Sequence, residues 1–233
     1  MENIADLFLL RKDITFLNFG SFGATPAPIF DAYQKWQRVL EAEPVQYIVF
    51  DGPGYLQTSR EALAKYIGVA DKDDLVFVTN PSFAVNMVAK NFPLQPGDQI
   101  LTTDIEYGAC DRTWEYYCAQ KGAEYVKQKI TLPITSKEKF IEEFFAGITP
   151  KTKAVFISHI TSATALKLPV HEICAIAKQK GLITFVDGAH GPAQTEVDLA
   201  TLQADFYTGA CHKWMMAPKG CSFLYAHKSV QPI

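Results

Sequence analysis

The stretch that decides the fold runs from residue 182 to residue 214. It begins Leu182-Ile183-Thr184-Phe185-Val186-Asp187-Gly188-Ala189-His190 and ends Ala204-Asp205-Phe206-Tyr207-Thr208-Gly209-Ala210-Cys211-His212-Lys213-Trp214. Each half contains a short apolar run that stops at polar residues, a pattern typical of a buried parallel strand. The first run delivers Asp187 and the second delivers Lys213. Because ligands of open α/β sheets bind beyond the carboxyl ends of the strands, both side chains can face one ligand.

An acid beside a pyridinium nitrogen and a lysine that forms a Schiff base are the two protein groups that a pyridoxal phosphate (PLP) enzyme needs. Asp187 and Lys213 are residues of these two types. Each also has an ordinary interpretation, because Asp-Gly after a strand often forms only a turn and a lysine after a strand is commonly solvated. The hypothesis of a PLP site therefore depends on what the rest of the chain adds.

The 233-residue chain has the composition of an ordinary globular protein, with 48% hydrophobic and 20% charged residues. Its net charge of -3 lacks the excess of positive charge that is expected of a nucleic-acid-binding protein. No apolar run approaches the length of about 18 residues that suggests a membrane span, and no signal peptide is expected at the N-terminus. The five cysteines form no Cys-x-x-Cys pattern, which favours a reducing, cytoplasmic compartment and predicts no metal site.

Strand and helix patterns alternate along the chain, which predicts an α/β fold: a mostly parallel sheet with helices on both faces. Strand patterns lie at residues 75–79, 99–103, 154–159, 182–187, around 205, and at 221–226. Helical patterns lie at residues 29–41, 55–67, 81–91, 104–122, from 136, and at 169–180. The chain stops just after an apolar strand, so we expect it to be a fragment.

Polar turns after the strands carry further candidates. Asn80-Pro81-Ser82-Phe83 joins a strand to a helix, where free amides and the helix dipole favour a phosphate, although Asn80 or Ser82 can equally serve only as a cap. Tyr107 can stack on a flat ring or simply pack. The glycines of segment 14–28 allow close approach to a ligand, and a plain loop is an equally good interpretation. Missing glycine fingerprints disfavour a nucleotide-binding domain.

Together these residues resemble fold-type I PLP-dependent enzymes of the class V aminotransferase family, and most of all its isopenicillin N epimerase-like members, close to the cysteine desulfurases and kynureninases. The most specific part is the strand end Asp187-Gly188-Ala189-His190 followed by His212-Lys213. The other matching segments occur in family order over nearly the whole chain, at residues 17–23, 41–44, 80–86, 104–108 and 158–159.

The resemblance implies the fold of the large domain of PLP-dependent transferases, with a seven-stranded type of sheet. It implies that residues 1–30 form an N-terminal segment approaching the active site and that residues 31–233 form the PLP-binding large domain. Family members continue into a small C-terminal domain, absent here, which typically carries an arginine for the substrate carboxylate.

The resemblance also implies a role for each matching residue. Lys213 would hold PLP, Asp187 would keep the ring nitrogen protonated, and His190 would lie near the phenolic oxygen, for which Ser162 or Thr161 are weaker candidates. Ser82, the amide of Phe83 and His212 would bind the phosphate. Tyr107 would stack on the ring. The residues approaching the substrate would be Asn18, Gly20 and Ser21.

Three positions depart from the family pattern. Pro81 removes an amide donor from the phosphate turn, Ala210 stands where many desulfurases have a phosphate-binding serine, and Ala165 replaces a usual glycine. These departures imply that phosphate binding is weaker or differently shared than in relatives.

The implied function is a PLP-dependent enzyme, forming a homodimer, that acts at the α-carbon of a small amino-acid substrate. The residues leave open whether it epimerises, transaminates or eliminates. A cysteine desulfurase or carbon–sulfur lyase is the alternative, with Cys211 as its candidate nucleophile, although buried cysteines are usually inert. An alternative of another class is a truncated PLP-binding domain without activity.

Overall fold

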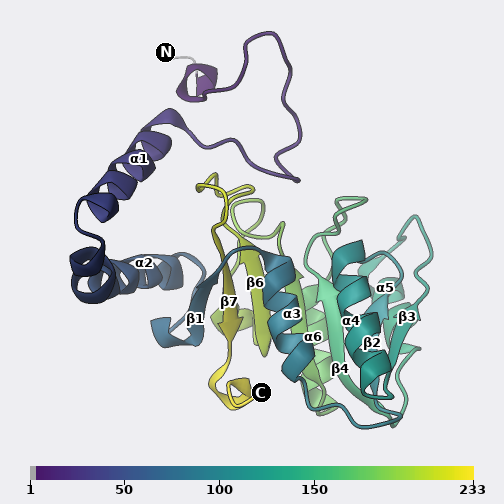
Figure 1. The fold of residues 1–233 in the computed structure, drawn as a ribbon. Coiled ribbons are helices and arrows are strands. Elements are labelled where there is room, and N and C mark those ends of the chain that lie inside the picture. Colours follow the sequence, from purple (N-terminus) through teal and green to yellow (C-terminus); the bar gives the residue numbers. More distant parts are fainter. Residues whose placement is uncertain (1–3) are drawn as a thin grey trace.

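A single seven-stranded sheet organises the computed structural model, which describes residues 4–233 (Figure 1). The strands are β1 (Leu75–Val78), β2 (Gln99–Thr103), β3 (Glu124–Gln128), β4 (Thr152–Ser158), β5 (Ile183–Gly188), β6 (Phe206–Ala210) and β7 (Ser222–Ala226). Their order is β1-β7-β6-β5-β4-β2-β3. β7 runs antiparallel to both of its neighbours and the other pairs are parallel, which confirms the predicted mostly parallel sheet.

Helices cover both faces of the sheet, as predicted. One face carries α3 (Pro81–Asn91) and α4 (Gly108–Gln120), and the other carries α5 (Lys137–Phe145), α6 (Val170–Gln179), the short α7 (Leu199–Leu202) and the end of α2 (Gly52–Tyr66). Successive strand residues point to opposite faces. Val155 and Ile157 therefore enter one core, whereas Ala154 and Phe156 enter the other. Burial on both faces explains why the central strands are continuous apolar runs.

The direction of winding reverses between β2 and β4. α4 joins β2 to β3 over one face, and α5 joins β3 to β4 over the other. The residues of β2 that pair with β4 run from Gln99 to Leu101, so the carboxyl ends of the two strands diverge. Such a reversal creates the crevice in which open α/β sheets bind ligands.

The N-terminal part of the chain forms an arm beside the sheet (Figure 1). It comprises a 3-10 turn (Ile4–Leu7), α1 (Ala27–Ala42) and a π-helical segment (Gln46–Asp51). None of their described residues is buried, so the apolar face predicted for α1 does not join the core. Short 3-10 turns also lie at Lys72–Asp74 and Lys228–Val230. Among the described residues, no helix combines the length and apolar character needed to cross a bilayer.

Two features differ from the sequence-based expectation. β3 was not predicted, because its residues Glu124-Tyr125-Val126-Lys127-Gln128 carry charges that suit the exposed edge of a sheet and hide the strand pattern. The helix expected from residue 104 begins at Gly108, since residues 104–107 form a turn. In that turn the carboxylate of Asp104 accepts a hydrogen bond from the Ile130 amide at 3.0 Å.

Candidate active site

A cavity of about 550 Å³ lies at the carboxyl ends of the parallel strands. Most of the residues singled out in the sequence line it: Gly20, Ser21, Ser82, Tyr107, Ser162, Asp187, His190, His212 and Lys213. They come from the N-terminal segment, from the end of β5, and from the turns that follow β1, β2, β4, β5 and β6. Its volume falls within the range of small-molecule sites. Of the site candidates named from the sequence, Asn18, Phe83, Thr161 and Cys211 lie outside this lining.

Asp187 is the most enclosed charged group in this cavity. Its residue is 4% exposed, and its carboxylate accepts hydrogen bonds from the Ala189 amide at 2.9 Å and from the Cys110 thiol at 3.5 Å. No ion pair involves Asp187 in the described part of the chain, and burial raises its pKa. The charge of nearby Lys213 offsets part of the cost of burying this carboxylate. Because a buried carboxylate without a direct ion pair is still costly, the cavity suits a ligand that brings a cationic N–H.

Lys213 approaches the same cavity from the turn after β6. Its Nζ lies 3.2 Å from Nε2 of His190, and Nδ1 of that ring lies 3.3 Å from the indole nitrogen of Trp214. Burial lowers the pKa of Lys213, and burial together with the charge of Lys213 lowers the pKa of His190 to about 4. Lys213 therefore gives up its proton more readily than an exposed lysine, as an amine must before it can attack a carbonyl carbon.

The turn after β1 holds the residues expected at a phosphate. Asn80 caps α3, and its side-chain oxygen accepts the Phe83 amide at 2.8 Å. The Phe83 amide thus already has an acceptor in the protein, while the neighbouring Ser82 lines the cavity. Across the cavity, Nδ1 of His212 lies 2.9 Å from the carbonyl oxygen of Cys221. Because a carbonyl only accepts, Nδ1 carries a proton and Nε2 is the atom left for a ligand.

The N-terminal segment closes one side of the cavity. Gly20, Ser21 and Phe22 line it, and the amide of Gly23 donates to the His212 carbonyl at 2.9 Å. A Cβ atom at position 23 would lie 1.8 Å from the carbonyl oxygen of Lys213. Glycine is therefore required there, because the two backbones touch directly.

Ser162 lines the cavity, whereas the hydroxyl of Thr161 bonds to Thr164 and to the Leu166 amide inside its own turn. The same turn contains Ala165 in the left-handed conformation, with φ 54°. That conformation favours glycine, which gives a physical reason why a glycine suits this position.

Three further residues contact the site but were not singled out from the sequence. Glu106 accepts hydrogen bonds from the Thr103 hydroxyl at 2.7 Å, from the Ser158 amide at 3.0 Å and from the Ser158 hydroxyl. It thereby ties together the diverging ends of β2 and β4, and burial of its carboxylate raises its pKa to about 7. Its position just after a strand was a usable signal. Cys110 and Trp214, by contrast, reach the site only through tertiary packing.

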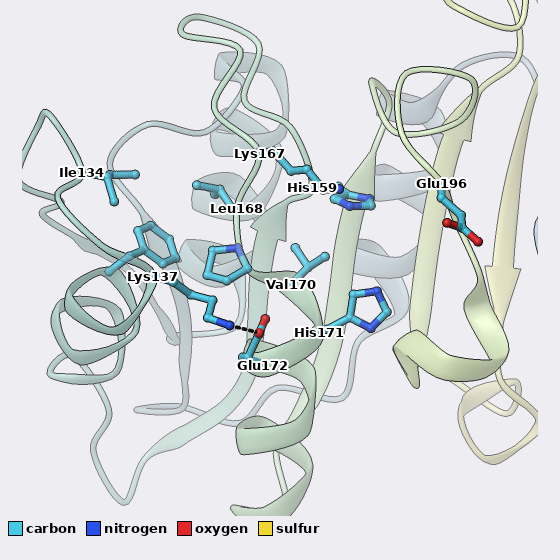
Figure 2. Close-up of a pocket in the computed structure, with 11 residues that line it drawn as sticks. Ile134, Lys137, His159, Lys167, Leu168, Val170, His171, Glu172 and Glu196 are labelled. Carbon is cyan, nitrogen blue, oxygen red and sulfur yellow. Dashed lines mark hydrogen bonds and ion pairs between the residues drawn. The ribbon is translucent and has the colours of Figure 1, made fainter.

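A second cavity, of about 320 Å³, lies at α5 and the start of α6 (Figure 2). Its polar groups largely have partners in the protein. Lys137 pairs with Glu172 at 2.6 Å, Lys167 donates to Thr195 at 2.6 Å, and Nδ1 of His159 lies 3.1 Å from the Tyr207 hydroxyl. This cavity is therefore a weaker candidate for chemistry than the one at the strand ends.

Comparisons with known proteins agree with the fold. Residues 53–232 match the family model described as aminotransferase class-V. The chain belongs to this family. Members of the class V family that resemble it include the isopenicillin N epimerase of Amycolatopsis lactamdurans, 38% identical over 96% of this chain and 56% of that protein. A putative L-cysteine desulfhydrase of Oryza sativa subsp. japonica is 31% identical over 91% of this chain and 47% of that protein.

Solved structures confirm the fold. The complex between the cystine C-S lyase C-DES and its reaction product cysteine persulfide matches 94% of this chain and 58% of that chain with a TM-score of 0.83 and 25% identity. The chain spans about half the length of the curated relatives that it matches. The class V resemblance and the α/β fold expected from the sequence are thus both confirmed.

Proposed function

We propose that the protein binds PLP in the 550 Å³ cavity and acts at the α-carbon of an amino acid, as an isopenicillin N epimerase-like enzyme. The observation that carries this proposal is the meeting in one cavity of Asp187, a buried acid whose pKa is raised, and Lys213, whose pKa is lowered by burial. The epimerase relatives support the same reading.

The residues present fit the cofactor. Asp187 would accept a hydrogen bond from the protonated ring nitrogen, Lys213 would bind covalently, and Ser82 and His212 would contact the phosphate. Tyr107, which is 46% exposed at the cavity, would lie against the ring. When bound, PLP supplies an electron sink for the electrons of a bond broken at the substrate α-carbon.

The protein groups then have separate tasks. Once the amine of the substrate has replaced Lys213 on the cofactor, the released Lys213 amine would take up the α-proton and return it. Asp187 would keep positive charge on the ring, since an anion beside a basic nitrogen favours its protonated form. Residues 20–22 of the N-terminal segment line one side of the cavity.

The deciding experiment is borohydride reduction of the protein mixed with PLP, followed by peptide mass spectrometry. We expect the PLP mass on Lys213 in the wild type and none on residue 213 in Lys213→Ala. Lys219 serves as a matched control, because it lies on the same loop but its amine donates to the Gly23 carbonyl. Equal labelling of Lys219, or an unlabelled Lys213, contradicts the assignment.

A carbon–sulfur lyase or cysteine desulfurase is the second candidate, supported by the desulfhydrase and desulfurase relatives. A persulfide-forming desulfurase needs a reactive thiolate. Cys211 is a poor candidate, because a hydrogen bond with Cys221 and burial both raise its pKa. Sulfide release from L-cysteine, measured beside α-proton exchange on other amino acids, separates lyase from epimerase. PLP capture without either activity identifies a non-catalytic cofactor domain.

We further propose that the protein forms a homodimer and is located in the cytoplasm. The dimer proposal is supported by the apolar arm, where large side chains are exposed: Ile29, Phe30, Tyr33, Trp36, Val39, Val45, Ile48, Val49, Phe50, Tyr55 and Leu56. An apolar surface this extended is typical of an interface. The cytoplasmic proposal is supported by five free cysteines, which suit a reducing compartment.

A further inference from the structure

The two ring nitrogens of His190 have different neighbours. Nδ1 faces the indole Nε1 of Trp214 at 3.3 Å, and Nε2 faces the amine of Lys213 at 3.2 Å. An indole N–H can only donate. The Nδ1 atom must therefore accept, so it carries no proton, and the single proton of a neutral imidazole sits on Nε2. A doubly protonated ring cannot make this contact, because both of its nitrogens are donors.

Packing holds the indole in place. Phe19 stacks on Trp214 with ring centroids 6.2 Å apart and planes 21° apart. Gly20 lies against both rings, since a Cβ atom there would be 3.5 Å from His190 and 3.7 Å from Trp214. The N-terminal segment thus packs against both His190 and Trp214. The tautomer of His190 is therefore set by the contact with Trp214 rather than by solvent.

The tautomer decides which form of Lys213 is favoured. An Nε2–H group offers a proton, and a neutral amine has the lone pair to accept it. An ammonium group has no lone pair and would meet the Nε2–H group donor to donor. The opposite tautomer would present a lone pair at Nε2 and favour the ammonium. Burial of Lys213 acts in the same direction, since it lowers the pKa of this amine.

We propose that Trp214 is a positioning residue that donates its indole N–H to Nδ1 of His190, holds that ring as the neutral Nε2–H tautomer, and so favours the neutral amine of Lys213. This inference rests on the proposed function in one respect, namely that Lys213 is the reactive amine. Trp214 touches neither substrate nor cofactor in this role and acts through His190.

The test measures the imidazole nitrogens by NMR in the full chain without cofactor, with uniformly ¹⁵N-labelled histidine. The His190 signal is assigned by its loss in His190→Gln among the five histidines. We expect the Nε2–H tautomer at neutral pH in the wild type and a shift toward Nδ1–H in Trp214→Phe, which keeps an aromatic ring but lacks the donor. Trp36→Phe, the same change in the exposed arm, is the matched control and should leave His190 unchanged.

The second readout is the pH dependence of reductive methylation at Lys213, followed by mass spectrometry. Trp214→Phe should raise the pKa of Lys213 by about one unit, which slows its modification at pH 8 roughly tenfold. If Trp214→Phe does not fold, replacement of Trp214 by 3-benzothienylalanine removes the N–H and keeps the shape of the indole.

An Nδ1–H tautomer in the wild type, or an unchanged tautomer and methylation rate without the indole N–H, overturns the proposal. Failure of the proposed function is seen separately. It would appear as a missing PLP label on Lys213, whereas the NMR and methylation measurements use no cofactor and remain valid.

Discussion

Asp187 is a buried acid that forms no ion pair in the described part of the protein, and its proposed role can be tested by an isosteric change. Asp187→Asn keeps the shape and the Ala189 hydrogen bond but loses the charge that would hold a proton on the ring. We expect PLP labelling of Lys213 to persist while α-proton exchange falls by roughly 10²-fold or more, as when a preorganised electrostatic contact is removed. Deuterium exchange from solvent into an amino acid, followed by NMR, provides the measurement. Undiminished exchange would show that the ring nitrogen pairs with another group.

Glu106 predicts a dependence of stability on pH. Burial raises its pKa from 4.5 to about 7, so between these values the unfolded chain is ionised while the folded protein keeps the proton. The contribution to stability is complete below pH 4.5 and is lost as pH rises to about 7, by roughly 1.4 kcal/mol per pKa unit at most. Urea unfolding of Glu106→Gln between pH 5 and pH 8 should show a flatter profile than the wild type. Identical slopes for both proteins would exclude Glu106 as the titrating group.

Single residues also show where sequence reasoning reached its limit. Asp187, Lys213 and His190 follow directly from strand ends, because parallel strands of one sheet bring their carboxyl ends to one edge. Cys110 lies within a helix, and its contact with Asp187 depends on how α4 packs on the sheet. Trp214 depends on the turn after β6 and on a segment almost 200 residues earlier in the chain. Such contacts have no local pattern in the sequence.

At the scale of elements, the N-terminal segment is joined to the active-site turn by backbone contact at Gly23. Gly23→Ala would place a methyl group against the Lys213 carbonyl, which should destabilise the protein by about 1–3 kcal/mol and weaken PLP binding. Gly54→Ala is the control, since position 54 in α2 has open space around it and alanine favours a helix. Thermal melts and PLP titrations should separate the two variants. Equal behaviour would mean that the segment does not touch Lys213 in solution.

In the turn after β4, by contrast, a substitution is expected to stabilise the protein. Ala165 is held at φ 54°, a conformation that costs an L-residue about 1–2 kcal/mol and glycine little. Ala165→Gly should therefore raise the melting temperature by a few degrees, since about 1 kcal/mol corresponds to roughly 2–4 °C at this size. The same substitution inside a helix, Ala64→Gly, should lower the melting temperature. Calorimetry of both variants gives the comparison, and a lower melting temperature for Ala165→Gly would contradict the strain argument.

Elements differed in how well they could be predicted. The buried strands β4, β5 and β6 were found because they are nearly continuous apolar runs between polar turns. β3 was not predicted, because an edge strand tolerates charged residues that hide the strand pattern. The π-helical segment Gln46–Asp51 was not predicted either, because its apolar residues are not arranged around a core. The apolar face of α1 was recognised as a helix face, but sequence periodicity cannot say what covers it.

For the whole molecule, the proposed homodimer predicts that the arm is needed for association. Ile48, which is 61% exposed, lies in the π-helical segment of the arm. Ile48→Glu should weaken dimerisation at least tenfold, because a charge would be buried in an apolar contact. Tyr116→Glu changes a side chain that is 57% exposed on α4 and should leave association unchanged. Sedimentation velocity over a range of concentrations measures both. A wild type that stays monomeric would refute the dimer proposal.

The pairing of β1 with β7 has a consequence for the synthesis of the protein on the ribosome. β1 finds its neighbour only when β7 is synthesised, because Leu75 pairs with Tyr225, roughly 150 residues later. Until then β6, which leads to Lys213, is an edge strand without its antiparallel neighbour. Lys213 therefore emerges before the sheet around it can close, so the nascent chain exposes an open strand edge of the kind that chaperones protect from aggregation. Pairing across such a separation should also make completion of this sheet edge a late event in folding.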